Sequence, residues 1–244
     1  MIKRVLIVVL LAVAASTQTK VVGPSKLGPG SYVQAPQVQV CYQQFFGKTV
    51  NCSLTVTNGW TIVAEGFNAA AVALNTPTAG CTTFTAQTGT TTTDGQVWSI
   101  GTATSTGSCT VTQTTTDASN VEMGITVFAL SPLVTNGTID ATVTTSNYAT
   151  GYHSSAFSGP SVTGVTNNDV YLATGYQNGG GNSLTISSAN MPCTSDNSQL
   201  IGGAGDLWMA QGHCTVATAG AKAPGWSVGQ GGQTYATATI ALQP

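Results

Sequence analysis

Glu65 and Glu122 are the only glutamates of the chain, and they carry its most definite candidate chemistry. Glycoside hydrolysis needs two carboxylates, one acting as the general acid and the other as the nucleophile or base. Both residues fall on predicted strands, and a β-sandwich can bring two carboxyl groups to one cleft at about 5 to 10 Å. The alternative is that both side chains face solvent, as glutamates usually do. The sequence favours this alternative, so a glycosidase is the last of three functional hypotheses.

Residues 225 to 229 match the Gly-x-Ser-x-Gly pattern of serine hydrolases, with Ser227 at its centre. In those enzymes the serine lies on a sharp turn between a strand and a helix, and the triad follows in the order serine, acid, histidine. Here no helix is predicted after Ser227, and both histidines, His153 and His213, precede it. We therefore interpret this segment as a hairpin, and the sequence predicts no catalytic residue.

Metal, cofactor and nucleic-acid sites also lack support. Calcium needs six to eight oxygen ligands, and Asp94 and Asp206 belong to no Asp-x-Asp run. The glycine-rich stretches 179–181 and 202–205 precede no predicted helix, so they do not indicate a phosphate site. The few basic residues form no cluster, which argues against a nucleic-acid partner. The sequence thus predicts no metal and no cofactor.

Four aromatic residues are the candidates for ligand binding. Trp60 and Trp226 have no tryptophan at the corresponding place of the internal repeat described below. If they are exposed beside Tyr152 or Tyr176, either can stack on a sugar ring. Such a platform would make the protein a carbohydrate-binding module. The alternative is that these side chains fill a core, as large aromatic residues more often do.

Six cysteines form an even set without any Cys-x-x-Cys pair, and the chain has only two histidines to complete a metal site. This spacing argues against zinc. In an exported chain with few charges, six cysteines instead indicate three disulfides, which persist in an oxidising compartment. Free buried thiols are the alternative. The cysteines are Cys41, Cys52, Cys81, Cys109, Cys193 and Cys214.

Residues 1–15 have the features of a secretory signal peptide. Two basic residues precede an apolar run from Val5 to Leu11, and small residues follow, so cleavage is expected after Ala14 or Ala15. The apolar run is about half of the ~20 residues that a membrane helix needs. The mature chain is therefore expected outside the cell or at the cell surface, without stable membrane insertion.

The composition predicts an all-β fold. Charged residues make up 6% of the 244 residues, against about a quarter in an ordinary soluble domain, and threonine outnumbers the 29 glycines. Amphipathic helices need Lys, Glu and Arg on their wet face, whereas Thr, Val and Tyr suit a pleated sheet. The expected exterior is rich in hydroxyl groups and weakly charged, which suits assembly or glycan contact.

A duplication is visible when the chain is aligned with itself, beginning with residues 56–67 beside residues 165–176. The matches keep their order and involve scarce residues, which low complexity does not explain. An equivalent tryptophan in both halves predicts core packing. The further matches are Cys81 with Cys193, Trp98 with Trp208, Cys109 with Cys214, and residues 126–132 with 238–244.

The duplication also predicts which cysteines pair. If a bond joins the two cysteines of the first repeat, the equivalent bond joins the two cysteines of the second, and the remaining pair is left over. All three bonds close short loops. In the chain-entropy model, each is expected to add about 3 kcal/mol to the free energy of unfolding. The predicted bridges are Cys81–Cys109, Cys193–Cys214 and Cys41–Cys52.

Turn signals about every 8 to 12 residues favour a β-sandwich or jelly roll built from two similar halves over residues 40–244. Repeat 1 is expected at about 54–132, a connection at 133–162, and repeat 2 at about 163–244. Either each half is a small domain or the halves pair around a pseudo-dyad, and we favour pairing because a five-strand half buries little core. Residues 16–39 are expected to form an extended arm, a tether or a strand added to a neighbour's sheet. The predicted strands are 61–67, 82–86, 96–102, 109–116 and 121–130, then 170–177, 183–188, 206–212, 214–217 and 233–242.

Both halves open with a Val-Thr-Asn turn, contain a central tryptophan strand and close with Ala-Leu-x-Pro. In this pattern the chain resembles a duplicated β-sandwich module, jelly-roll-like, that recurs in exported bacterial surface proteins and phage structural proteins. The resemblance implies a surface or structural component. Our leading hypothesis is a secreted structural or adhesive protein, not an enzyme, with glycans, other copies of itself or surface proteins as partners. A carbohydrate-binding module is the alternative.

Overall fold

The structure is a computed structural model, and all secondary structure in its described residues is β. The predicted all-β class is therefore confirmed. The predicted signal peptide, Asp94, Asp206 and both glycine-rich stretches lie outside the described residues. The described residues are 18–20, 37–68, 72–87, 97–117, 119–131, 143–164, 169–178, 183–187, 191, 193–201, 207–229 and 233–242.

The first half of the chain forms two antiparallel sheets. The larger sheet has the strand order β1-β2-β9-β4-β7-β6, and the smaller has the order β3-β8-β5. The strands are β1 Gln18–Lys20, β2 Val38–Gly47, β3 Thr49–Val56, β4 Thr61–Asn68, β5 Thr78–Ala79, β6 Thr85–Ala86, β7 Val97–Thr102, β8 Gly107–Thr114 and β9 Val121–Leu130.

The second half forms one large antiparallel sheet and two small ones. The large sheet has the order β10-β19-β13-β16-β15, and the small sheets are β11-β18-β14 and β12-β17. The strands are β10 Val143–His153, β11 Phe157–Ser158, β12 Val162–Gly164, β13 Asp169–Asn178, β14 Leu184–Ser187, β15 Cys193–Ile201, β16 Leu207–Val216, β17 Gly220–Lys222, β18 Gly225–Val228 and β19 Gln233–Leu242.

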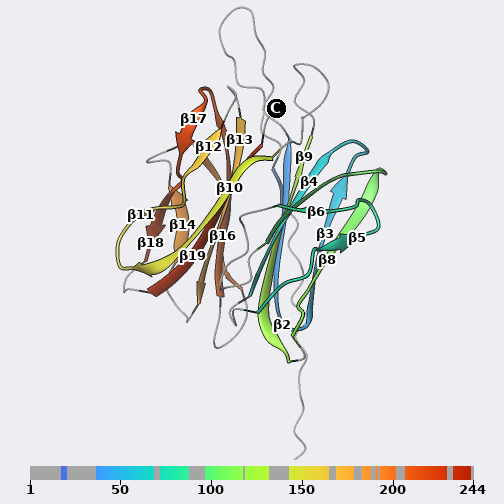
Figure 1. The fold of residues 1–244 in the computed structure, drawn as a ribbon, viewed down its shortest axis with the longest axis horizontal. Helices are drawn as coiled ribbons and strands as arrows, with labels where there is room; N and C mark the ends of the chain where they lie inside the picture. Colours follow the sequence, from blue (N-terminus) through green and yellow to red (C-terminus); the bar gives the residue numbers. More distant parts are fainter. Residues whose placement is uncertain are drawn as a thin grey trace, which may run out of the picture.

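The sheets stack in four layers, with the two large sheets in the middle (Figure 1). One core lies between the large sheets and joins the halves, with Val63 and Phe128 from the first and Leu172 and Ile240 from the second. A second core fills the space beneath β3-β8-β5, and two smaller cores lie beneath the small sheets of the second half. Both faces of the large sheets are consequently covered, and every residue of β4 is buried.

The two large sheets have corresponding strand orders: β2, β9, β4, β7 and β6 take the same places as β10, β19, β13, β16 and β15. Gly66 on β4 and Gly175 on β13 are aligned by sequence, and both make room for a side chain packed against the outer face of the large sheet. A Cβ at Gly66 would lie 2.5 Å from Oε1 of Gln113, and one at Gly175 would lie 2.6 Å from Cδ2 of Leu184. This agreement is what a duplication requires, although the duplication itself stays a prediction.

Strands β4, β7, β8, β9, β13, β14 and β19 lie where the sequence predicts them, within two residues at each end. The segments predicted as 206–212 and 214–217 form one strand, β16. Strands β2, β3, β10 and β15 lie where the sequence predicts no strand, and β10 falls inside the predicted connection 133–162. Self-alignment finds only segments whose sequences still match, and β2 and β10 share little sequence although they take corresponding places.

The three predicted disulfides are confirmed, but the two expected to be equivalent occupy different places. Cys109 lies on β8 in the small sheet, whereas Cys214 lies on β16 in the large sheet and is the direct ladder partner of Cys193. The alignment of Cys109 with Cys214 is therefore wrong in the structure, although the pairing drawn from it is right. The bridges are Cys41–Cys52, Cys81–Cys109 and Cys193–Cys214.

Trp98 and Trp208 also differ in position. Trp98 is the ladder partner of Glu65, but Thr174, which aligns with Glu65, pairs with Gln211. Trp98 is buried between the large sheets. Trp208 is half-buried against the opposite face of its sheet, where its Nε1 donates to a backbone carbonyl at 3.0 Å. The predicted core role is thus complete for Trp98 and partial for Trp208.

Among the described residues of the predicted arm, 16–39, Gln18–Lys20 form β1, which pairs antiparallel with residues 38–40 at the start of β2. The first large sheet therefore begins inside the arm. Three disulfides are consistent with an oxidising environment. Within the described part of the chain, no helix is long and apolar enough to span a membrane. Secretion itself stays a prediction.

Candidate functional site

The four aromatic residues predicted to bind a ligand do not form one surface. Trp226 on β18 is buried beneath the small sheet β11-β18-β14, and Tyr176 is buried between the large sheets. Trp60 is half-buried at the turn before β4. Tyr152 on β10 is 70% exposed. The predicted platform is therefore wrong for Trp226 and Tyr176, because both faces of the large sheets are covered and these rings fill the cores.

The two glutamates lie on one large sheet in different environments. Glu65 has no exposed surface, and its Oε2 accepts a hydrogen bond from the hydroxyl of Tyr176 in the other half. Its ladder partner on β9 is Thr126, and Glu122 lies four residues from Thr126 on the same strand, about 13 Å away. The expectation that Glu65 faces solvent is wrong. The separation and the burial give no support to a hydrolytic pair.

A buried polar cluster surrounds Glu65 at the interface between the halves. The Tyr176 hydroxyl lies 3.3 Å from Oγ1 of Thr126, and Nε2 of Gln211 donates to the same Oγ1 at 3.3 Å. Burial, followed by the charge of Glu65, raises the pKa of Tyr176 well above its usual range, so this hydroxyl keeps its proton and donates. The cluster draws two residues from each half, and it positions the large sheets against each other.

An exposed face of small polar side chains lies on the outer side of the β3-β8-β5 sheet. Exposed and buried residues alternate along the whole of β3, because its sequence TVNCSLTV alternates polar and apolar side chains. Strand β8 alternates in the same way. We call the outward residues the hydroxyl face: Thr49, Asn51, Ser53 and Thr55 on β3, with Ser108, Thr110, Thr112 and Thr114 on β8.

The side chains of the hydroxyl face stand in cross-strand pairs. The hydroxyls of Ser53 and Thr110 lie 2.7 Å apart, and the Thr112 hydroxyl donates to Oδ1 of Asn51 at 2.7 Å. Thr78 of β5 pairs with Thr112 and widens the row. Neighbouring strands are about 4.8 Å apart, and successive outward residues on a strand are about 6.7 Å apart. The face is thus a regular grid of uncharged donors and acceptors.

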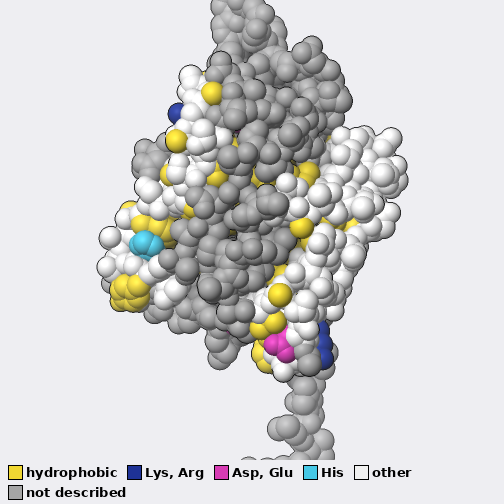
Figure 2. All heavy atoms as spheres, viewed as in Figure 1, with side chains coloured by type: hydrophobic (Ala, Val, Ile, Leu, Met, Phe, Trp, Pro, Cys, Tyr) yellow, Lys and Arg dark blue, Asp and Glu magenta, His cyan; other side chains and the backbone are white. Residues whose placement is uncertain are grey.

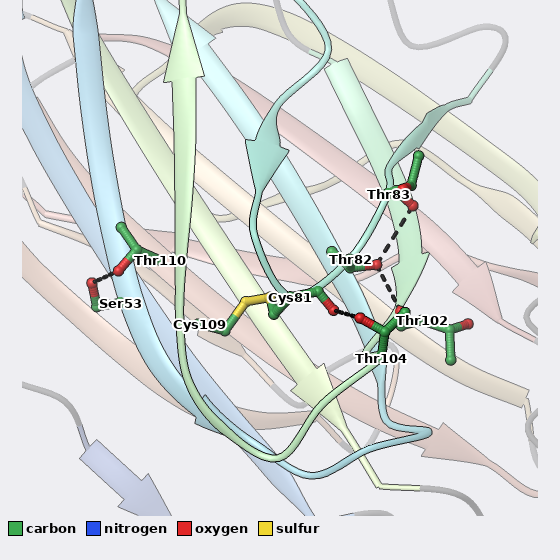
Figure 3. Close-up of a disulfide and its surroundings, with 8 residues drawn as sticks. All are labelled: Ser53, Cys81, Thr82, Thr83, Thr102, Thr104, Cys109 and Thr110. Atoms are coloured by element: carbon green, nitrogen blue, oxygen red, sulfur yellow. Dashed lines mark hydrogen bonds between the residues drawn. A yellow bond between two sulfur atoms is a disulfide. The ribbon is translucent and has the colours of Figure 1, made fainter.

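Two disulfides hold this grid from beneath. Cys52 on β3 points into the core and is bonded to Cys41 on β2 of the large sheet. Cys109 on β8 is bonded to Cys81 (Figure 3), and the carbonyl oxygen of Cys81 accepts a hydrogen bond from the hydroxyl of Thr104. Each long strand of the hydroxyl face is therefore tied covalently to structure below it. Such constraints keep the outward groups in a fixed geometry.

No residue of the hydroxyl face is charged. Figure 2 shows that charged side chains on the described surface in view occur as isolated spots. A hydroxyl group both donates and accepts hydrogen bonds, so a flat grid of them can bond to an extended surface of the same kind. Composition predicts a hydroxyl-rich exterior but carries no information on where the hydroxyl groups gather. The turn signals and repeats do not predict a strand at β3 either. The alternation from Thr49 to Val56 is the signal that locates it.

The remaining sequence candidates form no site. Ser227 lies within strand β18 of a small sheet, and no helix follows in the described residues. Nδ1 of His213 lies 2.8 Å from Oδ2 of Asp196 in a nearly buried pair. His153 stacks on Phe157, with ring centroids 3.7 Å apart. Over the ranges that the structure describes, no group of His, Cys, Asp and Glu is arranged to hold a metal ion.

The chain matches no protein-family model, no curated protein and no solved structure. The resemblance to a module of exported and phage proteins therefore stays a prediction. The observed structure defines a class only: an all-β, sandwich-like protein of stacked antiparallel sheets with three disulfides.

Proposed function

We propose that the protein is a secreted structural or adhesive component, without enzymatic activity, that attaches to uncharged polysaccharide surfaces through its hydroxyl face. The observation that carries this proposal is the grid of cross-strand pairs on β3 and β8, held from beneath by two disulfides. Three disulfides in so weakly charged a chain also fit an extracellular setting.

The geometry favours an extended ligand over a single sugar. One hydrogen bond between hydroxyls in water contributes only about 0.5 to 1.5 kcal/mol, so useful affinity needs many in register. A rigid grid loses little conformational entropy on binding, which lets weak contacts add up. Without charges on the face, binding is expected to depend little on salt.

The two other candidate functions have less support. A carbohydrate-binding module of the predicted kind needs an exposed aromatic platform, and Trp226 and Tyr176 are buried. A glycosidase needs two carboxyl groups about 5 to 10 Å apart at a cleft. Glu65 is buried, and its ladder partner Thr126 lies about 13 Å along β9 from Glu122. Polysaccharide adhesion through hydroxyl groups needs neither feature.

The test is adsorption of the purified mature protein to insoluble cellulose and chitin, with reducing-end release measured in the same tubes. The double variant Ser53→Lys/Thr110→Lys places two charges at the centre of the hydroxyl face. We expect its adsorption constant to fall at least about tenfold, which corresponds to 1.4 kcal/mol. The control is Thr218→Lys/Ala221→Lys, which adds the same charge at exposed positions of the second half and should adsorb like the parent chain.

Three results would overturn the proposal. The first is no adsorption to either polysaccharide, and the second is equal loss in the face variant and the control. The third is release of reducing ends, which would revive an enzymatic role for Glu65 or Glu122. Near-ultraviolet circular dichroism of both variants establishes that they are folded.

A further inference from the structure

Among the described residues, the first large sheet has one strand more than the second. Strand β1 pairs with the outer edge of β2. Strand β10 takes the place of β2 in the second sheet, and it is a terminal strand: among the described residues, nothing is hydrogen-bonded to its outer edge. The second half therefore offers the kind of edge that β1 occupies in the first half.

The edge of β10 lacks the usual protection. Natural edge strands are short, bulged, or carry lysine or proline, which prevents pairing with another chain. Strand β10 runs from Val143 to His153 and contains no Asp, Glu, Lys, Arg or Pro. Its register with β19 is unbroken from Thr145 to His153, and the one irregularity lies at its start. A long, uncharged edge of this kind is a template for strand addition.

The arm is suited to leave its own sheet. Strand β1 makes only three ladder pairs with β2. The sequence from Thr17 to Val22 contains four β-branched residues before Gly23 and Pro24, so its composition favours a longer strand than β1. Residues 21–37 connect β1 to β2, and a chain of this length spans up to about 60 Å when fully extended. The arm can therefore reach a neighbouring molecule.

We propose that the outer edge of β10 binds the β1 arm of a second copy of this chain, so that copies join head to tail. The arm would add as an antiparallel strand, with backbone hydrogen bonds along β10. The arm and the edge are different surfaces, so the contact is heterologous and extends into a chain or closes into a ring. This inference extends the structural side of the proposed function and rests on no property of the hydroxyl face.

The first measurement is the mass of the mature chain, beginning at Ser16, by sedimentation over a wide range of protein concentration and without polysaccharide. We expect multiples of the monomer mass that grow with concentration. A chain that lacks residues 16–20 should stay monomeric. The hydroxyl-face variant Ser53→Lys/Thr110→Lys should assemble like the parent chain, which separates failure of this inference from failure of polysaccharide adhesion.

Two neighbouring proline variants test the edge itself. In an antiparallel pair, the N–H groups of successive residues point alternately to the partner strand and away from it. Of Tyr148→Pro and Ala149→Pro, one therefore blocks the outer edge and the other breaks the ladder with β19. The variant that keeps the parent melting temperature is the outward one, because proline is tolerated on that side. It should be monomeric at every concentration.

A synthetic peptide of residues 16–22 identifies the binding edges by stoichiometry. The chain without residues 16–20 should bind two peptides, one at β2 and one at β10. The same chain with the outward proline should bind one. A parent chain that is monomeric throughout would overturn the inference, as would assembly that survives deletion of the arm. Equal peptide stoichiometry with and without the outward proline would also overturn it.

Discussion

Among single residues, Tyr176 has the most defined structural role, because its hydroxyl donates to the buried carboxylate of Glu65. Tyr176→Phe removes this donor and keeps the ring, which stacks on Phe67 with centroids 4.3 Å apart. We expect the free energy of unfolding to fall by about 1 to 3 kcal/mol, because a buried acceptor loses a hydrogen bond. Urea denaturation measures the change. In the control, Tyr171→Phe, the lost bond is to the carbonyl of Gly220, and the fall should be smaller.

The pH dependence of stability tests the same residue. The pKa of Tyr176 is raised in the folded protein, whereas the phenol of an unfolded chain ionises near pH 10. The contribution of Tyr176 to the free energy of unfolding is therefore constant below about pH 10. It is lost as the pH rises above this value, at about 1.4 kcal/mol per pH unit. In Tyr176→Phe, the free energy of unfolding should therefore decline less steeply at alkaline pH, by that amount per pH unit. Identical slopes in the two proteins would show that Tyr176 ionises alike in the folded and unfolded states.

The burial of Glu65 and Tyr176 could not be predicted from the sequence, for one physical reason. Alternation tells which residues share a face of a strand, but a sandwich of two layers is expected to leave one face wet. Here four layers cover both faces of the large sheets, so polar residues on β4 and β13 are buried as well. The cysteine pairs, in contrast, follow from the proposed repeats, and the pairing is right although Cys109 and Cys214 take different places in the fold.

At the level of elements, strand β3 depends on the bridge beneath it. Cys41→Ala/Cys52→Ala opens a loop of sequence separation 11, and we expect a loss of stability of about 3 kcal/mol. Because that bridge ties the hydroxyl face to the large sheet, adsorption to polysaccharide should also weaken. The control is Cys193→Ala/Cys214→Ala, with a separation of 21 and a similar cost, in the other half. Thermal unfolding and adsorption are measured on both.

Only the first of these double variants should lose adsorption at a temperature where both are folded. If both lose adsorption equally, stability in general, not the rigidity of β3, controls binding. If neither loses it, the bridge is not needed to hold the grid. Either result would remove the argument that disulfides prepare the hydroxyl face.

Strands were predictable from sequence where Thr, Val and aromatic residues run between clear turn signals, as in β4, β9 and β19. Strand β3 has a clean alternation, but it lies almost wholly before residue 56, where the similarity between the halves begins. Strand β10 contains Ser, Asn, Gly and Tyr without a clear two-residue period, so only its pairing with β19 makes it a strand. The hydroxyl face was hidden for this reason: one of its two strands was not predicted.

For the whole molecule, the central core determines whether the halves behave as one unit. Each half has its own core beneath a small sheet, which resembles two domains. Trp98, Tyr176 and Phe128, however, are fully buried where the large sheets meet, and the core there draws on both halves. Burial at about 25 cal/mol per Å² of apolar area makes such an interface a dominant stabilising term. The halves are therefore expected to unfold together.

Phe67→Ala tests this expectation, because Phe67 stacks on Tyr176 across the two halves. Truncation of a buried phenylalanine costs about 3 to 5 kcal/mol through lost burial and the cavity left behind. Hydrogen exchange followed by mass spectrometry at increasing urea measures the protection of the amides of β9 and β19. In each protein, both strands should lose protection at the same urea concentration, and this concentration should be lower in the variant than in the parent chain. If β19 stayed protected after β9 had opened, the halves would be independent domains, and the central core would be a contact between them, not a shared core.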